Sequence, residues 1–186
     1  MERVEPAVGG IAAWFSIVDG ERREAATGER LEVVAPSDGA VFATIPRGRA
    51  AEVDAAVAAA RTALERGPWA KLSATERGRL LTKLSALVAA RAEEIAEIES
   101  RDTGKPIGQG RADAVALARY FEFYGGAADK LMGETIPIST GYTALTLREP
   151  LGVVASIVPW NYPAQILGRV AGAALAAGNT LVVKPA

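Results

Sequence analysis

Residues 152–186, GVVASIVPWNYPAQILGRVAGAALAAGNTLVVKPA, contain two apolar, β-branched runs with a helical pattern between them. Residues 153–158 and 181–183 form the runs, which are typical of parallel strands buried on both faces. Pro163 suits the first turn of a helix, and Gly178 suits a left-handed turn before the second run. The stretch therefore predicts a β-α-β unit and an α/β fold.

Small residues recur every four positions along the predicted helix, at Gly168, Gly172 and Ala176. One face of this helix is therefore nearly bare, and we expect another backbone to approach it closely. Ordinary α/β packing explains this pattern without any ligand.

Polar and aromatic residues follow both predicted strands. Residues 159–163, PWNYP, follow the first, and Lys184 with Pro185 ends the second. Because ligands of open α/β sheets bind outside the carboxyl ends of the strands, we expect both groups at one rim. Spacing alone favours a helix cap for Asn161 and a solvated strand end for Lys184.

The PWNYP motif, followed by the segment GNTLVVKPA at residues 178–186, resembles the NAD(P)-dependent aldehyde dehydrogenase superfamily. The resemblance extends over nearly the whole chain, which corresponds to less than half of such an enzyme. It implies the amino-terminal part of the aldehyde dehydrogenase-like fold. That part has leading antiparallel strands, helices, a β-ribbon and the first βαβ unit of an incomplete Rossmann-like domain.

The same resemblance implies three regions. Residues 1–131 would supply the strands and helices of the dinucleotide-binding domain, and residues 132–150 a ribbon similar to the oligomerisation arm. Residues 151–186 would form the first βαβ unit of the dinucleotide-binding domain, truncated, and the catalytic domain would be absent. Two strands with one crossover helix would not cover both faces of the sheet, so we expect exposed apolar surface.

Site residues also follow from the resemblance. It implies that Asn161 donates a hydrogen bond to the oxyanion, and that Lys184 hydrogen-bonds the adenosine ribose of NAD or NADP. It further implies that the dinucleotide is lined by Ile157, Pro159 and Trp160.

Two residues of the predicted helix region correspond to the aldehyde tunnel of the family. Tyr162 matches the aromatic residue beside the tunnel. Arg169 matches a tunnel-side position and could receive an anionic or polar aldehyde tail, although a solvated helix residue is the simpler interpretation.

The nucleophile of the family is absent. Its enzymes oxidise an aldehyde to a carboxylic acid through a cysteine thiolate, with a glutamate as general base, and this chain has no Cys. We therefore predict that the chain alone is inactive. Two alternatives remain: part of an enzyme that passes the acyl group to coenzyme A, or a non-catalytic protein that oligomerises with full-length relatives.

Composition narrows the possible partners. The 186 residues are 49% hydrophobic, and 21 basic residues nearly balance 22 acidic ones. This balance favours neither nucleic acid nor an anionic membrane as a partner. Without Cys or His the usual zinc ligands are missing, so no metal site is expected. The first 22 residues resemble neither a signal peptide nor a membrane span. We expect a cytoplasmic protein that acts on a small aldehyde and forms a homo-oligomer when complete.

Patterns before residue 105 predict strands at 15–18, 31–34 and 41–45, and a helix at 50–65. Ser73 and Glu76 match a capping box that opens a second helix, with a break near Arg91. The apolar faces of these helices are predicted at Val53, Val57, Ala60 and Leu64, and at Leu80, Leu81, Leu84, Leu87 and Val88. Their charged residues are expected to form a solvated face.

Residues 102–106, DTGKP, predict a helix end, with Gly104 as terminator and Lys105 near the negative end of the helix dipole. A further helix is expected from about Ala112 to Met132. Its core face is predicted at Val115, Ala118, Phe121, Tyr124 and Ala128. Residues 134–138 and 142–148 then alternate as a two-stranded ribbon would.

Overall fold

Turn residues organise the first part of the chain into short strands. The computed structural model describes residues 11–186. The Asp19–Gly20 turn, with φ of 55° and 77°, joins β2 to β3 in an antiparallel pair. A second sheet has the order β1-β5-β4, in which β4 and β5 are antiparallel and β1 is parallel to β5. The bounds are β1 Ala12–Ala13, β2 Ser16–Val18, β3 Glu21–Arg23, β4 Arg30–Val34 and β5 Val41–Pro46.

The three predicted strands in this region are confirmed to within one residue. The parallel β1 strand was not predicted, because two alanines give no strand pattern. The prediction that no signal peptide or membrane span opens the chain falls partly on residues 1–10, which lie outside the described residues. Within residues 11–186, no helix is long and apolar enough to cross a membrane.

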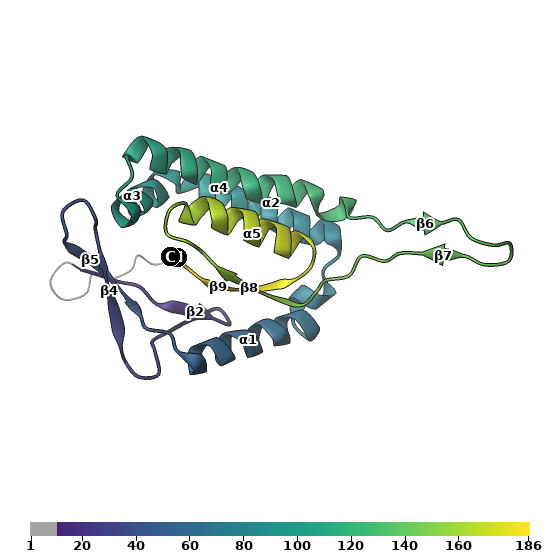
Figure 1. Ribbon diagram of the computed structural model, residues 1–186, viewed down its shortest axis with the longest axis horizontal. Helices are drawn as coiled ribbons and strands as arrows, with labels where there is room; N and C mark the ends of the chain where they lie inside the picture. The colour runs from purple at the N-terminus through teal and green to yellow at the C-terminus, as the bar shows by residue number, and fades with distance from the viewer. Residues whose placement is uncertain (1–10) are drawn as a thin grey trace.

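Five α-helices form the body of the described chain (Figure 1). They are α1 Ala50–Glu65, α2 Ala74–Ala90, α3 Ala92–Thr103, α4 Ile107–Ala127 and α5 Pro163–Ala176, with short 3₁₀ turns η1 Pro68–Lys71 and η2 Ala128–Lys130. The predicted break falls at Arg91, between α2 and α3. The predicted capping box is also present, since Ser73 N–H donates to Glu76 Oε2 at 2.8 Å and Glu76 N–H to Ser73 Oγ at 3.3 Å.

The predicted core face of α1 is right at Ala60 and Leu64, which are buried and half-buried, and wrong at both valines. Its bounds match the prediction, but Val53 is 54% exposed and Val57 39%, whereas Ala60 is buried. Helix α1 lies against β8 and β9, and several of its alanines, Ala60 among them, are more buried than its two valines. Small side chains allow the closer approach, so the valines are left on the outer face.

The start of α4 is also corrected. The helix begins at Ile107, five residues before the predicted start, because Pro106 both ends the previous segment and suits a helix start. Val115 is 63% exposed and does not belong to the core face. Ala118 and Phe121 are buried as predicted, and the buried face also includes Gly110, Asp113, Ala114, Leu117 and Gly125.

The predicted β-α-β unit is confirmed. Strand β8 Val153–Ile157 pairs in parallel with β9 Thr180–Lys184, and α5 makes the crossover. The bare face of α5 packs against α4. A Cβ atom added at Gly172 would lie 2.6 Å from Tyr124 Cδ2, and one at Gly168 would lie 3.0 Å from Leu117 Cδ1. Helix α4 therefore packs closely on this face, but it does so through side chains and not through the backbone that was predicted.

The two faces of the β8–β9 pair are both covered, contrary to the expectation. Helix α5 lies on one face and α1 on the other (Figure 1). The sequence pattern could not indicate that a helix about 100 residues earlier would return to this sheet. Apolar surface is nevertheless exposed at the strand ends, since Leu151 is 96% exposed and Ile157 80%. The expected exposed apolar surface is therefore present at the strand ends.

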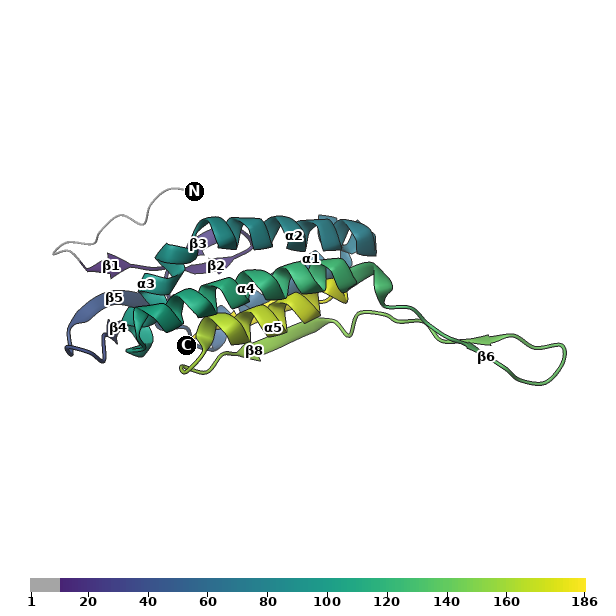
Figure 2. The ribbon, with the colours of Figure 1, turned by 90° about the horizontal axis from the view of Figure 1, so that it is seen from above.

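The predicted ribbon projects away from the helices (Figures 1 and 2). Its paired part is shorter than expected, with β6 Thr135–Ile136 antiparallel to β7 Ala144–Leu145. Several of its large side chains are exposed, including Tyr142 and Leu147, each at 75%. Exposed apolar groups on an isolated ribbon indicate a surface that another segment or chain would cover.

Candidate functional site

The two predicted site segments meet at one edge of the sheet. Ile157 and Lys184 are paired residues at the carboxyl ends of β8 and β9, and Val158 N–H donates to the Lys184 carbonyl at 3.0 Å. The PWNYP loop therefore leaves the sheet beside Lys184. We call this site, residues 157–161 with Lys184, the strand rim. The predicted shared rim is confirmed.

Apolar and cationic groups are both available at the strand rim. Ile157 is 80% exposed and Trp160 75%, and Pro159 is also exposed. Lys184 is exposed, and its side chain forms no hydrogen bond or ion pair with residues 11–186. Flat apolar side chains beside an unpaired ammonium group fit one wall of a dinucleotide site. The rings and ribose faces of a dinucleotide can pack on these apolar side chains, and its ribose hydroxyl oxygens can accept hydrogen bonds from the Lys184 ammonium.

Asn161 does not cap α5. The residue that precedes the helix is Tyr162, and the start of α5 has no side-chain capping bond. Asn161 is exposed, and its carboxamide makes no hydrogen bond with the described residues. Its N–H donors therefore remain available to a ligand oxygen at the strand rim.

Tyr162 is held by two residues from the start of α4 and the turn before it. Gln109 Nε2 donates to the Tyr162 hydroxyl at 3.0 Å. The Lys105 ammonium lies 4.7 Å from the centroid of the Tyr162 ring, within the range of a cation–π contact. The aromatic residue beside the strand rim is thus fixed at both its ring and its hydroxyl.

Lys105 belongs to a buried group of charges that the sequence did not reveal. Its ammonium lies 2.6 Å from Glu99 Oε1 and 2.5 Å from Asp113 Oδ2. The exposed fractions of these side chains are 9% for Lys105, 4% for Glu99 and 2% for Asp113. We call Glu99, Lys105 and Asp113 the buried ion cluster. Gln165, in the first turns of α5, donates its Nε2 to Asp113 Oδ1 at 2.6 Å.

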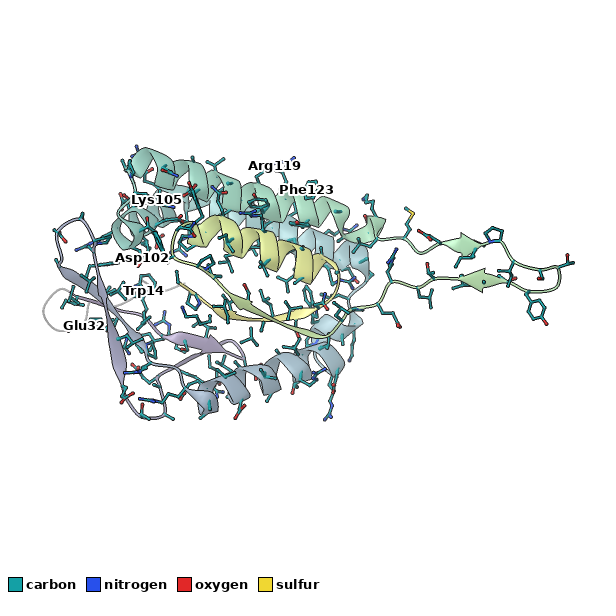
Figure 3. The ribbon with its side chains drawn as sticks, in the orientation of Figure 1. Trp14, Glu32, Asp102, Lys105, Arg119 and Phe123 are labelled. Carbon is teal, nitrogen blue, oxygen red and sulfur yellow. The ribbon has the colours of Figure 1, made fainter. Side chains whose placement is uncertain are left out.

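The buried ion cluster connects α3, which carries Glu99, with α4, which carries Asp113, and through Gln165 it also contacts α5. Lys105, labelled in Figure 3, follows α3, and Asp113 lies in α4.

The expectation of a solvated charged face is wrong at Glu99, because its side chain is buried. Asp113 had one signal in the sequence, since it lies at helical spacing between Gly110 and Leu117 on an otherwise apolar face.

The two carboxyl groups of the cluster differ in pKa. Burial raises the pKa of Glu99 above its ordinary value, and this effect outweighs the hydrogen bond from Lys105. Burial also acts to raise the pKa of Asp113, but hydrogen bonds from Lys105 and Gln165 outweigh it and hold that pKa below its ordinary value. Burial acts to lower the pKa of Lys105, and its bonds to both carboxyl groups reverse this and raise it. Asp113 is therefore the more acidic of the two carboxyl groups.

Arg169 lies on α5, and its side chain is exposed. Its guanidinium carbon is 5.9 Å from the centroid of the Tyr120 ring on α4. The side chain thus rests against α4 and is not part of the strand rim. Its role at an aldehyde tunnel stays a prediction.

A βαβ unit with exposed apolar and cationic side chains at its carboxyl rim is typical of open α/β folds, in which ligands bind outside the strand ends. The sequence profile of the aldehyde dehydrogenase family matches residues 23–186. This match covers most of the chain, which therefore belongs to the aldehyde dehydrogenase family.

Curated relatives agree with this assignment. Over 170 residues the chain is 46% identical to a hydroxyisobutyraldehyde dehydrogenase of Mycolicibacterium austroafricanum, covering 91% of this chain and 33% of the relative. It is 43% identical over 169 residues to the NADP/NAD-dependent aldehyde dehydrogenase PuuC of Escherichia coli, covering 90% of this chain and 34% of the relative.

Solved structures are similar as well. The NAD-dependent aldehyde dehydrogenase of Sinorhizobium meliloti superposes with a TM-score of 0.91 at 40% identity, over 95% of this chain and 36% of that one. PnpE, which has been solved from Pseudomonas sp. WBC-3 and in complex with nicotinamide adenine dinucleotide, gives in the latter structure a TM-score of 0.87 at 43% identity, over 91% of this chain and 35% of that one. This chain therefore spans about a third of the length of the proteins that it matches.

Proposed function

We propose that this chain supplies the oxyanion donor and one wall of the cofactor site of an NAD(P)-dependent aldehyde dehydrogenase, which oxidises an aldehyde to a carboxylic acid. The observation that carries the proposal is the strand rim. There the loop that carries Asn161 leaves β8 beside Lys184, and neither the Asn161 carboxamide nor the Lys184 ammonium has a hydrogen-bond partner among residues 11–186.

Asn161 serves this reaction as a hydrogen-bond donor. Nucleophilic attack on an aldehyde carbonyl leaves negative charge on its oxygen, and a fixed N–H group stabilises that charge more than it stabilises the neutral carbonyl. Because the Asn161 side chain does not cap α5, its amide N–H groups can donate to the oxyanion.

Lys184, Ile157, Pro159 and Trp160 form the wall for NAD or NADP. The cofactor, when bound, accepts a hydride from the substrate. Lys184 would hydrogen-bond the ribose, and the apolar side chains would pack against the flat parts of the dinucleotide. The domain assignment proposed from the sequence, with residues 1–131 and 151–186 in one dinucleotide-binding domain, agrees with the packing of α1 and α4 on the βαβ unit.

Tyr162 and Arg169 are proposed for the aldehyde side. Tyr162 would contribute its fixed aromatic ring, and Arg169 would meet an anionic or polar tail of the substrate. The ribbon at residues 132–150 would join copies of the complete protein into a homo-oligomer. We place the protein in the cytoplasm, with neither nucleic acid nor membrane as a partner.

The direct test is an assay of the longer protein that carries this chain. We expect it to convert small aldehydes to acids with NAD or NADP in the absence of coenzyme A. Turnover that requires coenzyme A, with no acid formed without it, would instead favour the acylating alternative. Lack of any turnover, combined with mixed oligomers containing full-length relatives, would favour the non-catalytic role.

A further inference from the structure

The buried ion cluster needs an explanation other than stability. Its three charges are removed from water, and such a removal costs several kcal/mol per ion before any pairing energy is gained. Apolar residues of similar volume often replace buried ion groups with no loss of stability. A cluster of two carboxyl groups and one ammonium group, with side chains 2–9% exposed, therefore points to a requirement for fixed geometry.

The backbone around the cluster is itself constrained. Gly104 ends α3 in a left-handed conformation, with φ of 75°, and turns the chain so that Lys105 points back. Ser100 Oγ donates to the Lys105 carbonyl at 2.6 Å, and Thr103 Oγ1 donates to the Glu99 carbonyl at 2.7 Å. Lys105 is thus held at two points: its carbonyl accepts a hydrogen bond from Ser100, and its ammonium group is paired with Glu99 and Asp113.

Two contacts run from the cluster to the segment that carries Asn161. The Lys105 ammonium faces the ring of Tyr162, the residue next to Asn161, at 4.7 Å from the ring centroid. Asp113 accepts from Gln165, four residues after Asn161, at 2.6 Å. Asp113 is buried, so a bond to its carboxylate is strong and directional.

We propose that the buried ion cluster is a positioning device for Asn161, which fixes the angle of its loop through Tyr162 and Gln165. This inference rests on the proposed role of Asn161 as the oxyanion donor. The residues of the cluster are positioning residues, because none of them belongs to the strand rim. A displacement of about 1 Å in such a donor can cost on the order of 100-fold in rate, so an indirect support can matter for turnover.

The positioning role predicts a selective effect on turnover. Lys184 is held by its pairing with β8, which does not depend on the cluster. Loss of the cluster's contact to Gln165 should therefore lower kcat and leave the dissociation constant for the cofactor unchanged.

The test uses the longer protein that carries this chain, with Gln165→Leu and Gln165→Asn. Leu lacks the amide, and Asn is one methylene too short to reach Asp113. We expect either substitution to lower kcat by about 10- to 100-fold. Having two variants keeps the test valid if one of them does not fold, as checked by its thermal unfolding.

The matched control is Glu93→Gln. Glu93 and Arg111 form an ion pair of 2.6 Å that also joins α3 to α4, but both side chains are more than half exposed and neither contacts the Asn161 segment. This control should leave kcat unchanged.

The decisive measurement combines Gln165→Leu, or Gln165→Asn if the former does not fold, with Asn161→Ala. If the cluster acts through Asn161, the double variant should have the same kcat as Asn161→Ala alone, because the cluster can no longer position a donor that is absent. Additive losses, or an unchanged kcat in both folded Gln165 variants, would overturn the positioning role while leaving the oxyanion role intact. An unchanged kcat in Asn161→Ala would overturn the oxyanion role and the inference with it.

Discussion

The carboxamide of Asn161 is the residue-scale feature on which the proposed chemistry depends. In the longer protein, Asn161→Ala should lower kcat by about 100- to 1000-fold, which is the usual cost of losing one oxyanion donor. The affinity for the cofactor should change little, because Asn161 is proposed to meet the substrate oxygen. Steady-state kinetics under conditions where chemistry limits the rate would check this. An unaltered kcat would contradict the assignment.

Lys184 should show the opposite behaviour. Its ammonium, at the end of β9, has no partner among residues 11–186 and is proposed to hold the ribose, so Lys184→Ala should weaken dinucleotide binding more than it slows the chemical step. Calorimetric titration of NAD and NADP into the longer protein would measure this. If both dissociation constants match those of the unaltered protein, Lys184 does not belong to the cofactor site.

The two buried carboxyl groups should respond differently to removal of charge. Asp113 has a lowered pKa, so it stabilises the folded state at pH values above its ordinary pKa of 3.8, and this stabilisation is lost as the pH falls through the folded value. Asp113→Asn should therefore lower the free energy of unfolding by about 3 kcal/mol at pH 7, and by less in acid.

Glu99 provides the comparison. Its pKa is raised above the ordinary 4.5, so its contribution becomes less favourable to folding as the pH rises through the folded value. Glu99→Gln leaves Lys105 paired with Asp113 and should change the free energy of unfolding by less than about 1 kcal/mol at pH 7. Denaturant unfolding at pH 7 and at a pH below 3.8 would check both variants. Equal losses for the two at pH 7 would contradict the assigned difference.

At the scale of elements, the contact between α4 and α5 sets the position of the site helix. Gly172 lies so close to Tyr124 that an added Cβ would be 2.6 Å from its ring. Gly172→Ala should therefore lower the free energy of unfolding by about 1–3 kcal/mol, although alanine favours a helix.

Gly126 is the matched control for this contact. It also lies in a helix, near the end of α4, but an added Cβ there would meet nothing within 4 Å. Gly126→Ala should raise the free energy of unfolding by about 0.5–1 kcal/mol through helix propensity alone. Chemical denaturation of both variants would measure the difference. Stabilisation by both substitutions would show that α5 can move away from α4 at little cost.

At the scale of the whole molecule, the chain lacks the cysteine that would start the proposed reaction. With no Cys there is no thiolate to attack the aldehyde, and with no His there is no imidazole base to activate a serine in its place. Residues 1–186 expressed alone should therefore form no NADH from any aldehyde. They should also bind neither NAD nor NADP measurably, since Ile157 and Trp160 face solvent without an opposite wall. Sustained NADH formation, proportional to the amount of a mass-verified 186-residue chain, would refute this.

Local signals in the sequence determined most elements of this protein. The β-branched runs, the capping box at Ser73 and the left-handed exit at Gly178 each act within a few residues. Most strands, the starts of α1, α2 and α5 and the shared strand rim could therefore be predicted, whereas β1 and the start of α4 were missed. The motifs that resemble aldehyde dehydrogenases indicated the family, which the sequence profile of that family confirmed. The roles proposed for Asn161 and Lys184 remain predictions.

Only the tertiary structure decided which faces are buried and which charges meet. The exposure of Val53 depends on how α1 packs against β8 and β9, about 100 residues later in the chain. The cluster of Glu99, Lys105 and Asp113 depends on the turn at Gly104, which brings α3 and α4 together, and on the docking of Gln165 from α5. Periodicity describes one element at a time. Burial and charge pairing arise from contacts between elements, and for that reason these features were not predicted.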